Sequence, residues 1–115
     1  MIKTRLGMSY KVGDIVLIKF PFTNLKKSKK RPVLVVKSQS NLNDIVCFQI
    51  TSSSEQSNLL KIQNCDFESD FLPLDSYIKY DKCFTLSSEI VEKSIAKVNT
   101  PLLNKLKTLF CKELF

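Results

Sequence analysis

Histidine and tryptophan are absent from this 115-residue sequence, and glycine occurs only twice. Without histidine the chain can form neither a histidine-dependent catalytic triad nor a His-bearing zinc site. With two glycines it has no glycine-rich phosphate loop. No apolar run is long enough to span a membrane, and no apolar segment follows the first basic residues as it would in a signal peptide. We therefore expect no membrane association and a cytoplasmic location.

Cysteine is present but widely spaced, at Cys47, Cys65, Cys83 and Cys111, and no C-x-x-C motif occurs. Without histidine to complete a cluster, this spacing argues against a zinc site, so we expect neither a metal nor a cofactor. Cys47 and Cys83 lie inside apolar runs and are predicted to be small core residues. A reducing compartment is the default expectation for a chain without a recognisable signal peptide.

Size and charge narrow the class further. A chain of 115 residues with 43% hydrophobic side chains is predicted to fold as one globular domain, residues 1–115. The 18 basic and 11 acidic residues give a net charge of +7, which favours a polyanionic partner such as nucleic acid. Sixteen of the 18 cations are lysines, so a generally lysine-rich composition explains the charge as well.

Short β-branched and aromatic runs separated by turn signals predict strands. They cover residues 15–20, 32–36, 45–50, 59–62 and 93–98, with 77–80 and 82–86 forming two strands or one bent strand. From Thr100, predicted to be the N-cap, and Pro101 onward, leucines at helical spacing predict an amphipathic C-terminal helix. The predicted fold is mainly β, a small antiparallel barrel with this helix packed on it.

Alternation along the strands places polar side chains together. We assign one face of the third strand to the core: Val46, Phe48 and Ile50. Gln49 and Thr51 then share the opposite face, and Lys79 and Asp81 share one face of a later strand. These four residues could meet on one open surface. A solvated outer sheet face has the same pattern, so both interpretations stay open.

A second feature is the basic run 26–31, with five cations in six residues. Such a run is either a solvated loop or a phosphate-binding segment. Arg31 differs from its neighbours because it precedes Pro32 at the start of an apolar strand. A guanidinium anchored there can bind a phosphate with two parallel hydrogen bonds, which lysine cannot do.

The motifs, taken in order, resemble those of PemK/MazF-like toxins, the toxin halves of type II toxin–antitoxin pairs. The first signature is GDIV at 13–16, FPFT at 20–23 and KKRPVLV at 29–35; the second is QITS at 49–52; the third is SYIKYDK at 76–82, followed by FTL at 84–86. Their order and spacing carry the resemblance from residue 12 to about residue 86, and the C-terminal helix fits it as well.

This resemblance implies an SH3-like barrel that forms a homodimer and acts as a metal-independent endoribonuclease on single-stranded RNA, typically mRNA. Arg31 would hold the scissile phosphate and help to protonate the leaving oxygen, and Thr51 would hydrogen-bond a phosphoryl oxygen or orient the 2′-OH. Because the neighbouring 2′-OH is the nucleophile, the products would be a 2′,3′-cyclic phosphate and a 5′-OH. The expected RNA-binding residues are Lys29, Lys30, Gln49, Ser52, Lys79 and Asp81.

The chain departs from the family pattern at Lys79, where many members have arginine. Lysine lacks the planar fork of arginine, so the role of this position is open. A cognate antitoxin would lay an acidic, partly disordered segment across the basic site.

Two other functions fit a barrel of this kind. A CcdB-like toxin poisons DNA gyrase without cutting nucleic acid, but it relies on a tryptophan near its C-terminus, which this chain lacks. A catalytically degenerate RNA-binding barrel would keep much of its affinity without Arg31, whereas a nuclease would lose turnover.

Overall fold

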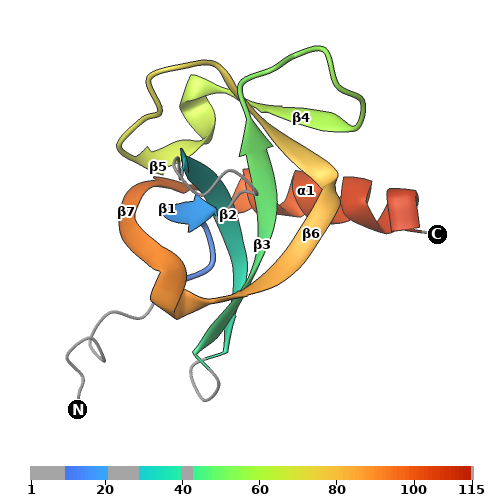
Figure 1. Cartoon of the computed structure of the whole chain (residues 1–115). Helices are drawn as coiled ribbons and strands as arrows, with labels where there is room; N and C mark the ends of the chain where they lie inside the picture. The colour runs from blue at the N-terminus through green and yellow to red at the C-terminus, as the bar shows by residue number, and fades with distance from the viewer. Residues whose placement is uncertain (1–9, 21–28, 40–42, 115) are drawn as a thin grey trace.

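The structure is a computed structural model, and it describes residues 10–20, 29–39 and 43–114. The described part of the chain is a β-sheet structure with one C-terminal α-helix (Figure 1). The strands are β1 (Asp14–Phe20), β2 (Lys29–Gln39), β3 (Asp44–Thr51), β4 (Leu59–Ile62), β5 (Phe67–Ser69), β6 (Ser76–Ser87) and β7 (Val91–Val98). The helix α1 spans Thr100–Leu114, and two short 3-10 turns are η1 (Asn64–Asp66) and η2 (Ser88–Ile90).

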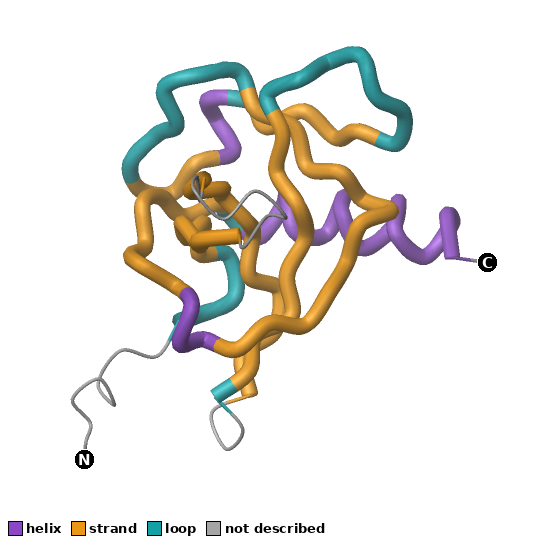
Figure 2. The backbone as a smooth tube through the Cα atoms, viewed as in Figure 1, coloured by secondary structure: helices purple, strands orange, loops and turns teal. Residues whose placement is uncertain are grey.

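All strand pairs are antiparallel, and the order across the sheet is β4-β6-β3-β2-β1-β7-β5. The sheet curls so that its two ends approach the same end of the molecule (Figure 2). Within the described residues the edge strands β4 and β5 do not pair, so the sheet is bent but not closed. The predicted class, an antiparallel β-structure with a C-terminal helix, is confirmed.

Both faces of the central strands are buried, which explains why their apolar runs do not alternate cleanly. One face carries Phe48 and Ile50, as predicted, and the helix packs on it through Leu102 and Leu106. Val46, predicted to share this core face, is only half-buried. The ring of Phe110 on the helix meets Phe48 edge-on, with ring centroids 5.1 Å apart. Burying these side chains contributes roughly 1.5–3 kcal/mol each, which fixes the helix to the sheet.

The opposite face, predicted to be polar along the third strand, holds a second apolar cluster. Its buried members are Val16, Ile18, Val33, Val35, Ile45 and Cys47. The third strand is therefore buried on both sides until Gln49 and Thr51, which are half-buried. Cys47 is a core residue as predicted, but the prediction for Cys83 was wrong, because it lies exposed on β6.

Gly13 joins three strands at the start of β1. Its φ of +99° suits glycine, and a Cβ there would lie 3.0 Å from the Val98 carbonyl oxygen. The Gly13 amide donates to the Val35 carbonyl at 2.8 Å, and its carbonyl accepts from the Val98 amide at 2.9 Å. A side chain at this position would therefore strain the junction of β1, β2 and β7.

The start of the helix differs from the prediction. The cap is Asn99 rather than Thr100, because the Asn99 side-chain oxygen accepts the Leu102 amide at 3.1 Å. The Asn99 side-chain amide also donates to the Cys65 carbonyl at 2.9 Å, which ties the helix to η1. Thr100 and Pro101 are the first two helical residues.

The other elements follow the predicted runs closely. The strand predicted at residues 59–62 is β4, and residues 76–87 form one strand, β6, whose pairing with β3 shifts between Phe48 and Gln49. Residues 63–74, predicted to be irregular, contain η1 and the three-residue strand β5. No helix in the described part of the chain is long and apolar enough to span a membrane.

Candidate nucleic-acid cleft

A cleft of about 490 Å³ opens where the start of β2 and the end of β3 meet the loop before β6. It is lined by Leu17, Lys30, Arg31, Pro32, Ile50, Thr51, Ser52, Phe71, Leu72, Pro73, Leu74, Ser76, Lys93 and Ile95. The floor is apolar because Leu17, Pro32 and Ile50 continue the sheet face on which the helix packs. This volume lies within the range of small-ligand sites.

Strand register brings Arg31 and Thr51 to this cleft together. Val33 of β2 pairs with Gln49 of antiparallel β3. Arg31 lies two residues before Val33 on β2, and Thr51 lies two residues after Gln49 on β3. In an antiparallel pair these two positions are near each other on neighbouring strands. Arg31 is exposed, and its backbone is fixed by pairing with Ile18 of β1. The two predicted catalytic residues thus share one site, although their chemical roles stay predictions.

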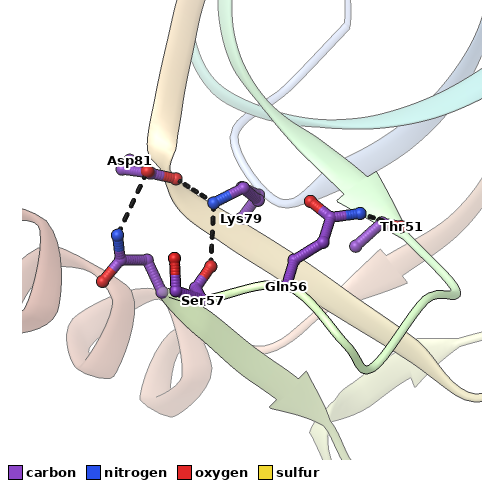
Figure 3. Close-up of polar contacts among 6 residues, drawn as sticks. Thr51, Gln56, Ser57, Lys79 and Asp81 are labelled. Carbon is purple, nitrogen blue, oxygen red and sulfur yellow. Dashed lines mark hydrogen bonds and ion pairs between the residues drawn. The ribbon is translucent and has the colours of Figure 1, made fainter.

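The Thr51 hydroxyl is held by the segment that follows it, residues 52–58. The Ser53 amide donates to Thr51 Oγ1 at 3.1 Å, and Gln56 Nε2 donates to the same oxygen at 3.3 Å. Figure 3 shows the Gln56 side chain reaching back over the segment to Thr51. The segment therefore restrains the hydroxyl at the edge of the cleft.

The charged residues that line the cleft are all cationic: Lys30, Arg31 and Lys93. Lys30 is half exposed and forms an ion pair with Glu92 at 3.0 Å, and Lys19 approaches the same carboxylate at 3.7 Å. The hydrogen bond from Lys30 lowers the pKa of Glu92 below its usual value. Among the described residues, three cations and no acidic side chain line the cleft, and this charge favours an anion there.

The loop between β5 and β6 supplies an apolar wall. Phe71 and Leu74 line the cleft although they are 65% and 66% exposed. The Phe71 ring is supported edge-on by Phe67, with centroids 5.4 Å apart. An exposed aromatic ring beside cations can stack an unpaired base while the cations hold its phosphate.

Lys79 and Asp81 lie in a separate polar cluster, beside the segment 52–58. Lys79 is only 8% exposed, and its ammonium donates to Asp81 Oδ1 and to the Ser57 carbonyl, both at 2.8 Å (Figure 3). Asn58 donates to the other carboxylate oxygen at 3.1 Å. The hydrogen bond from Lys79 is the main cause that lowers the pKa of Asp81. These charged groups therefore have partners within the chain, and the cluster fixes the segment.

The structure divides the sequence-predicted site residues into two groups. Lys30, Arg31, Thr51 and Ser52 line the cleft. Gln49, Lys79 and Asp81 do not; Gln49 is half-buried and pairs with Lys79 on β6.

Most of the basic run lies outside the residues that the structure describes. Lys29 belongs to β2, but its side chain lies outside the described residues, as do residues 21–28. Within this run, Arg31 is the residue on which the site depends, because it lines the cleft together with Thr51.

Sequence reasoning missed three residues of the site, Gln56, Phe71 and Lys93. Gln56 lies in a serine-rich loop whose composition signals only a turn. Phe71 lies in a stretch predicted to be irregular, and Lys93 lies in a predicted strand whose loose alternation marks no polar face. In each case only the folded arrangement relates the residue to Arg31 and Thr51.

Cys47 is a buried thiol. Burial is the main cause that raises the pKa of Cys47 to about 12, so its thiol stays protonated at neutral pH and is a poor nucleophile. In the part of the chain that the structure describes, no three Cys, Asp or Glu side chains come together as a possible metal site.

The sequence and the fold agree on the family. A family model, PemK-like, MazF-like toxin of type II toxin–antitoxin system, matches residues 11–114. Because this match covers nearly the whole chain, the protein belongs to the family of PemK/MazF-like toxins. Comparison with curated protein sequences gives no significant match.

Solved structures share the fold at low sequence identity. A MazE–MazF structure from Deinococcus radiodurans superposes with a TM-score of 0.74 at 16% identity, covering 93% of this chain and 96% of the other. An endoribonuclease in complex with its cognate antitoxin, from a mycobacterial species, gives a TM-score of 0.69 at 17% identity, covering 92% and 93%. The Mycobacterium tuberculosis toxin MazF-mt6 gives 0.63 at 15% identity, covering 84% and 91%.

Proposed function

We propose that this toxin is an endoribonuclease that cleaves single-stranded RNA, mRNA above all, in the cleft between Arg31 and Thr51. The observation that carries the proposal is the shared cleft itself: a guanidinium and a restrained hydroxyl meet beside an apolar wall. Cations suit the phosphate, and the exposed Phe71 ring suits an unstacked base. Family membership and the endoribonuclease activity named for one of the structural relatives support the same conclusion.

The proposed chemistry uses the substrate's own nucleophile. The 2′-OH oxygen attacks the adjacent phosphorus, the bond from phosphorus to the 5′ oxygen breaks, and the products are a 2′,3′-cyclic phosphate and a 5′-OH. The proton of the 2′-OH passes to water, and water gives a proton to the leaving 5′ oxygen, so no net proton is gained or lost. The protein has to orient the phosphate and stabilise the negative charge that builds up on its oxygens.

Each cleft residue has a distinct part in this step. Arg31 would hold two phosphoryl oxygens with its planar fork. Thr51 would donate its hydroxyl proton to a phosphoryl oxygen. Lys93 and Lys30 would attract the neighbouring phosphates without contributing sequence selectivity. Ser52 would add a polar contact beside Thr51.

The partners follow from the same cleft and from the family. The toxin would act in the cytoplasm as a homodimer, and a cognate antitoxin would inhibit it by laying an acidic segment over the cationic cleft. One structural relative was solved in complex with its cognate antitoxin, and another is a MazE–MazF structure.

Purified protein incubated with long single-stranded RNA in EDTA tests the activity. We expect cleavage, and we expect Arg31→Ala and Thr51→Val to reduce kcat/KM by at least about 100-fold, the usual loss when one donor to a developing oxyanion is removed. Lys61→Ala is the matched control, because Lys61 is an exposed cation on β4 away from the cleft. Equal activity of all four proteins would contradict the assignment of the site.

If folded wild-type protein left several long RNAs intact, the ribonuclease function would be wrong. A gyrase assay and a binding assay would then distinguish a gyrase poison from an RNA-binding barrel that does not cleave.

A further inference from the structure

The Thr51 hydroxyl has an unusual set of contacts, because the two atoms that contact its oxygen are both N–H donors. A hydroxyl group has one proton to donate and two lone pairs that accept. The Ser53 amide and the Gln56 side-chain amide both donate to Thr51 Oγ1, at 3.1 and 3.3 Å. Since neither nitrogen can accept a proton from the hydroxyl, the hydroxyl proton of Thr51 has to point to another acceptor. Among the described residues no acceptor for it is recorded, and Thr51 lines the cleft.

We propose that Gln56 is a positioning residue that orients the Thr51 hydroxyl as a donor toward an anion in the cleft. The inference rests on the proposed function for the identity of that anion, a phosphoryl oxygen of RNA. A donor that already points at the position where charge develops needs no reorganisation during the reaction. Gln56 thereby acts on the phosphate through Thr51 and does not contact it.

The backbone next to Gln56 is anchored firmly enough for this role. The Ser57 carbonyl accepts from the buried Lys79 ammonium at 2.8 Å, and the Asn58 carbonyl accepts from the Tyr80 amide at 3.0 Å. The Asn58 side chain also donates to Asp81, which is itself held by Lys79. Residues 57 and 58 are thus pinned to β6, so the exposed Gln56 side chain extends from a fixed point.

Gln56→Glu tests the direction of the hydrogen bond, because the two side chains have the same shape. A carboxylate only accepts, so Thr51 would donate its proton to the new side chain and withdraw it from the phosphate. We expect kcat to fall about 10- to 100-fold, approaching the Thr51→Val value, with a smaller change in KM. Gln56→Met removes the donor but leaves the Ser53 contact, so we expect only about a 2- to 5-fold loss.

The effect of added charge needs its own control. Ser54→Asp places the same negative charge in the same exposed segment without a recorded contact to Thr51. We expect its kcat to stay within about twofold of wild type. The introduced glutamate has a usual pKa of about 4.3, and its protonated form is again a donor. The difference in kcat between Gln56→Glu and wild type should therefore become smaller as the pH approaches 4. A purely structural defect would not narrow in this way.

A double-mutant cycle decides whether the effect passes through Thr51. In the Thr51→Val background, Gln56→Glu should change kcat by less than twofold, because no hydroxyl is left to orient. An undiminished loss in that background, or wild-type kcat in the single Gln56→Glu variant, would overturn the proposal.

Binding of a single-stranded 2′-deoxy oligonucleotide measures the same coupling without catalysis, since this ligand lacks the nucleophile. We expect Gln56→Glu to weaken oligonucleotide binding when Thr51 is present. The loss of affinity should be several-fold smaller when Gln56→Glu is introduced into the Thr51→Val variant. Coupling in binding without any RNA cleavage would contradict the proposed ribonuclease but support the role of Gln56. RNA cleavage without coupling between Gln56 and Thr51 would contradict only the proposed role of Gln56 and leave the ribonuclease function standing.

Discussion

Replacing Lys79 with methionine tests whether this lysine is a structural residue or an RNA-contacting one. Methionine keeps the apolar stem but removes the ammonium group, which makes two hydrogen bonds of 2.8 Å, to Asp81 and to the Ser57 carbonyl. Hydrogen bonds to charged groups contribute about 1.5–3 kcal/mol each, and the low end applies because the Asp81 side chain is 27% exposed. Since the freed groups regain some water, we expect the free energy of unfolding to fall by about 2 kcal/mol.

For a domain of this size, about 2 kcal/mol corresponds to a decrease in Tm of roughly 8 °C. Thermal and urea unfolding of Lys79→Met would be compared with Lys82→Met, which removes the same charge from an exposed position on the same strand. Surface substitutions of that kind usually change the free energy of unfolding by no more than about 0.5 kcal/mol. If Lys79→Met were as stable as Lys82→Met but had lost its affinity for RNA, the structural assignment of Lys79 would be wrong.

The same variant has a defined pH dependence. The pKa of Asp81 is lowered in the folded protein, chiefly by the hydrogen bond from Lys79. A carboxyl whose pKa is lower in the folded than in the unfolded protein stabilises the fold. This contribution is fully present at a pH above the unfolded-state pKa of about 3.9, and it is lost as the pH falls through the folded-state pKa. Lys79→Met removes this contribution, so the stability difference between the two proteins should shrink as the solution is acidified below about pH 4. A difference that stayed constant down to pH 2 would contradict this cause.

Two further predictions concern the helix cap and the apolar wall. Asn99→Ala removes the hydrogen bonds to the Leu102 amide and the Cys65 carbonyl, so we expect the free energy of unfolding in urea to fall by about 1–2 kcal/mol. Asn104→Ala on the exposed helix surface is the control, and equal stability of the two variants would refute the cap assignment. Phe71→Ala removes an exposed stacking surface, so we expect oligonucleotide affinity to fall about 5- to 100-fold with an unchanged Tm. Unchanged affinity would show that bases do not contact this wall, and loss of self-association instead would assign it to a dimer interface.

Much of the fold could be predicted from short-range patterns. The strand at Leu59–Ile62 and the helix from residue 100 follow from apolar periodicity and flanking polar residues. The strand β5 was missed because its three residues are strand only through pairing with β7, where Phe67 meets Val98. The Asn99 cap was missed because Thr100 and Pro101 make an equally good local signal, and only the contact with Cys65 favours the earlier residue.

The site was predictable in its residue types but not in its arrangement. Arg31 and Thr51 could be selected from their motifs, yet their proximity depends on the register of Val33 against Gln49, which a sequence does not show. Lys79 and Asp81 were grouped with Gln49 and Thr51 by strand alternation. The shift in pairing between Phe48 and Gln49 instead leaves Lys79 beside the segment 52–58, where it binds Ser57.

The central claim is that RNA is cleaved in this cleft by its own 2′-OH. The most direct measurement maps the product ends of a short single-stranded RNA that the wild-type protein cuts, beside the same RNA with one 2′-deoxyribose on the 5′ side of the cleaved phosphate. The account predicts a 2′,3′-cyclic phosphate and a 5′-OH from the first, and no cleavage at that position in the second. Cleavage of the 2′-deoxy substrate at the same bond, or products with a 5′-phosphate, would contradict it.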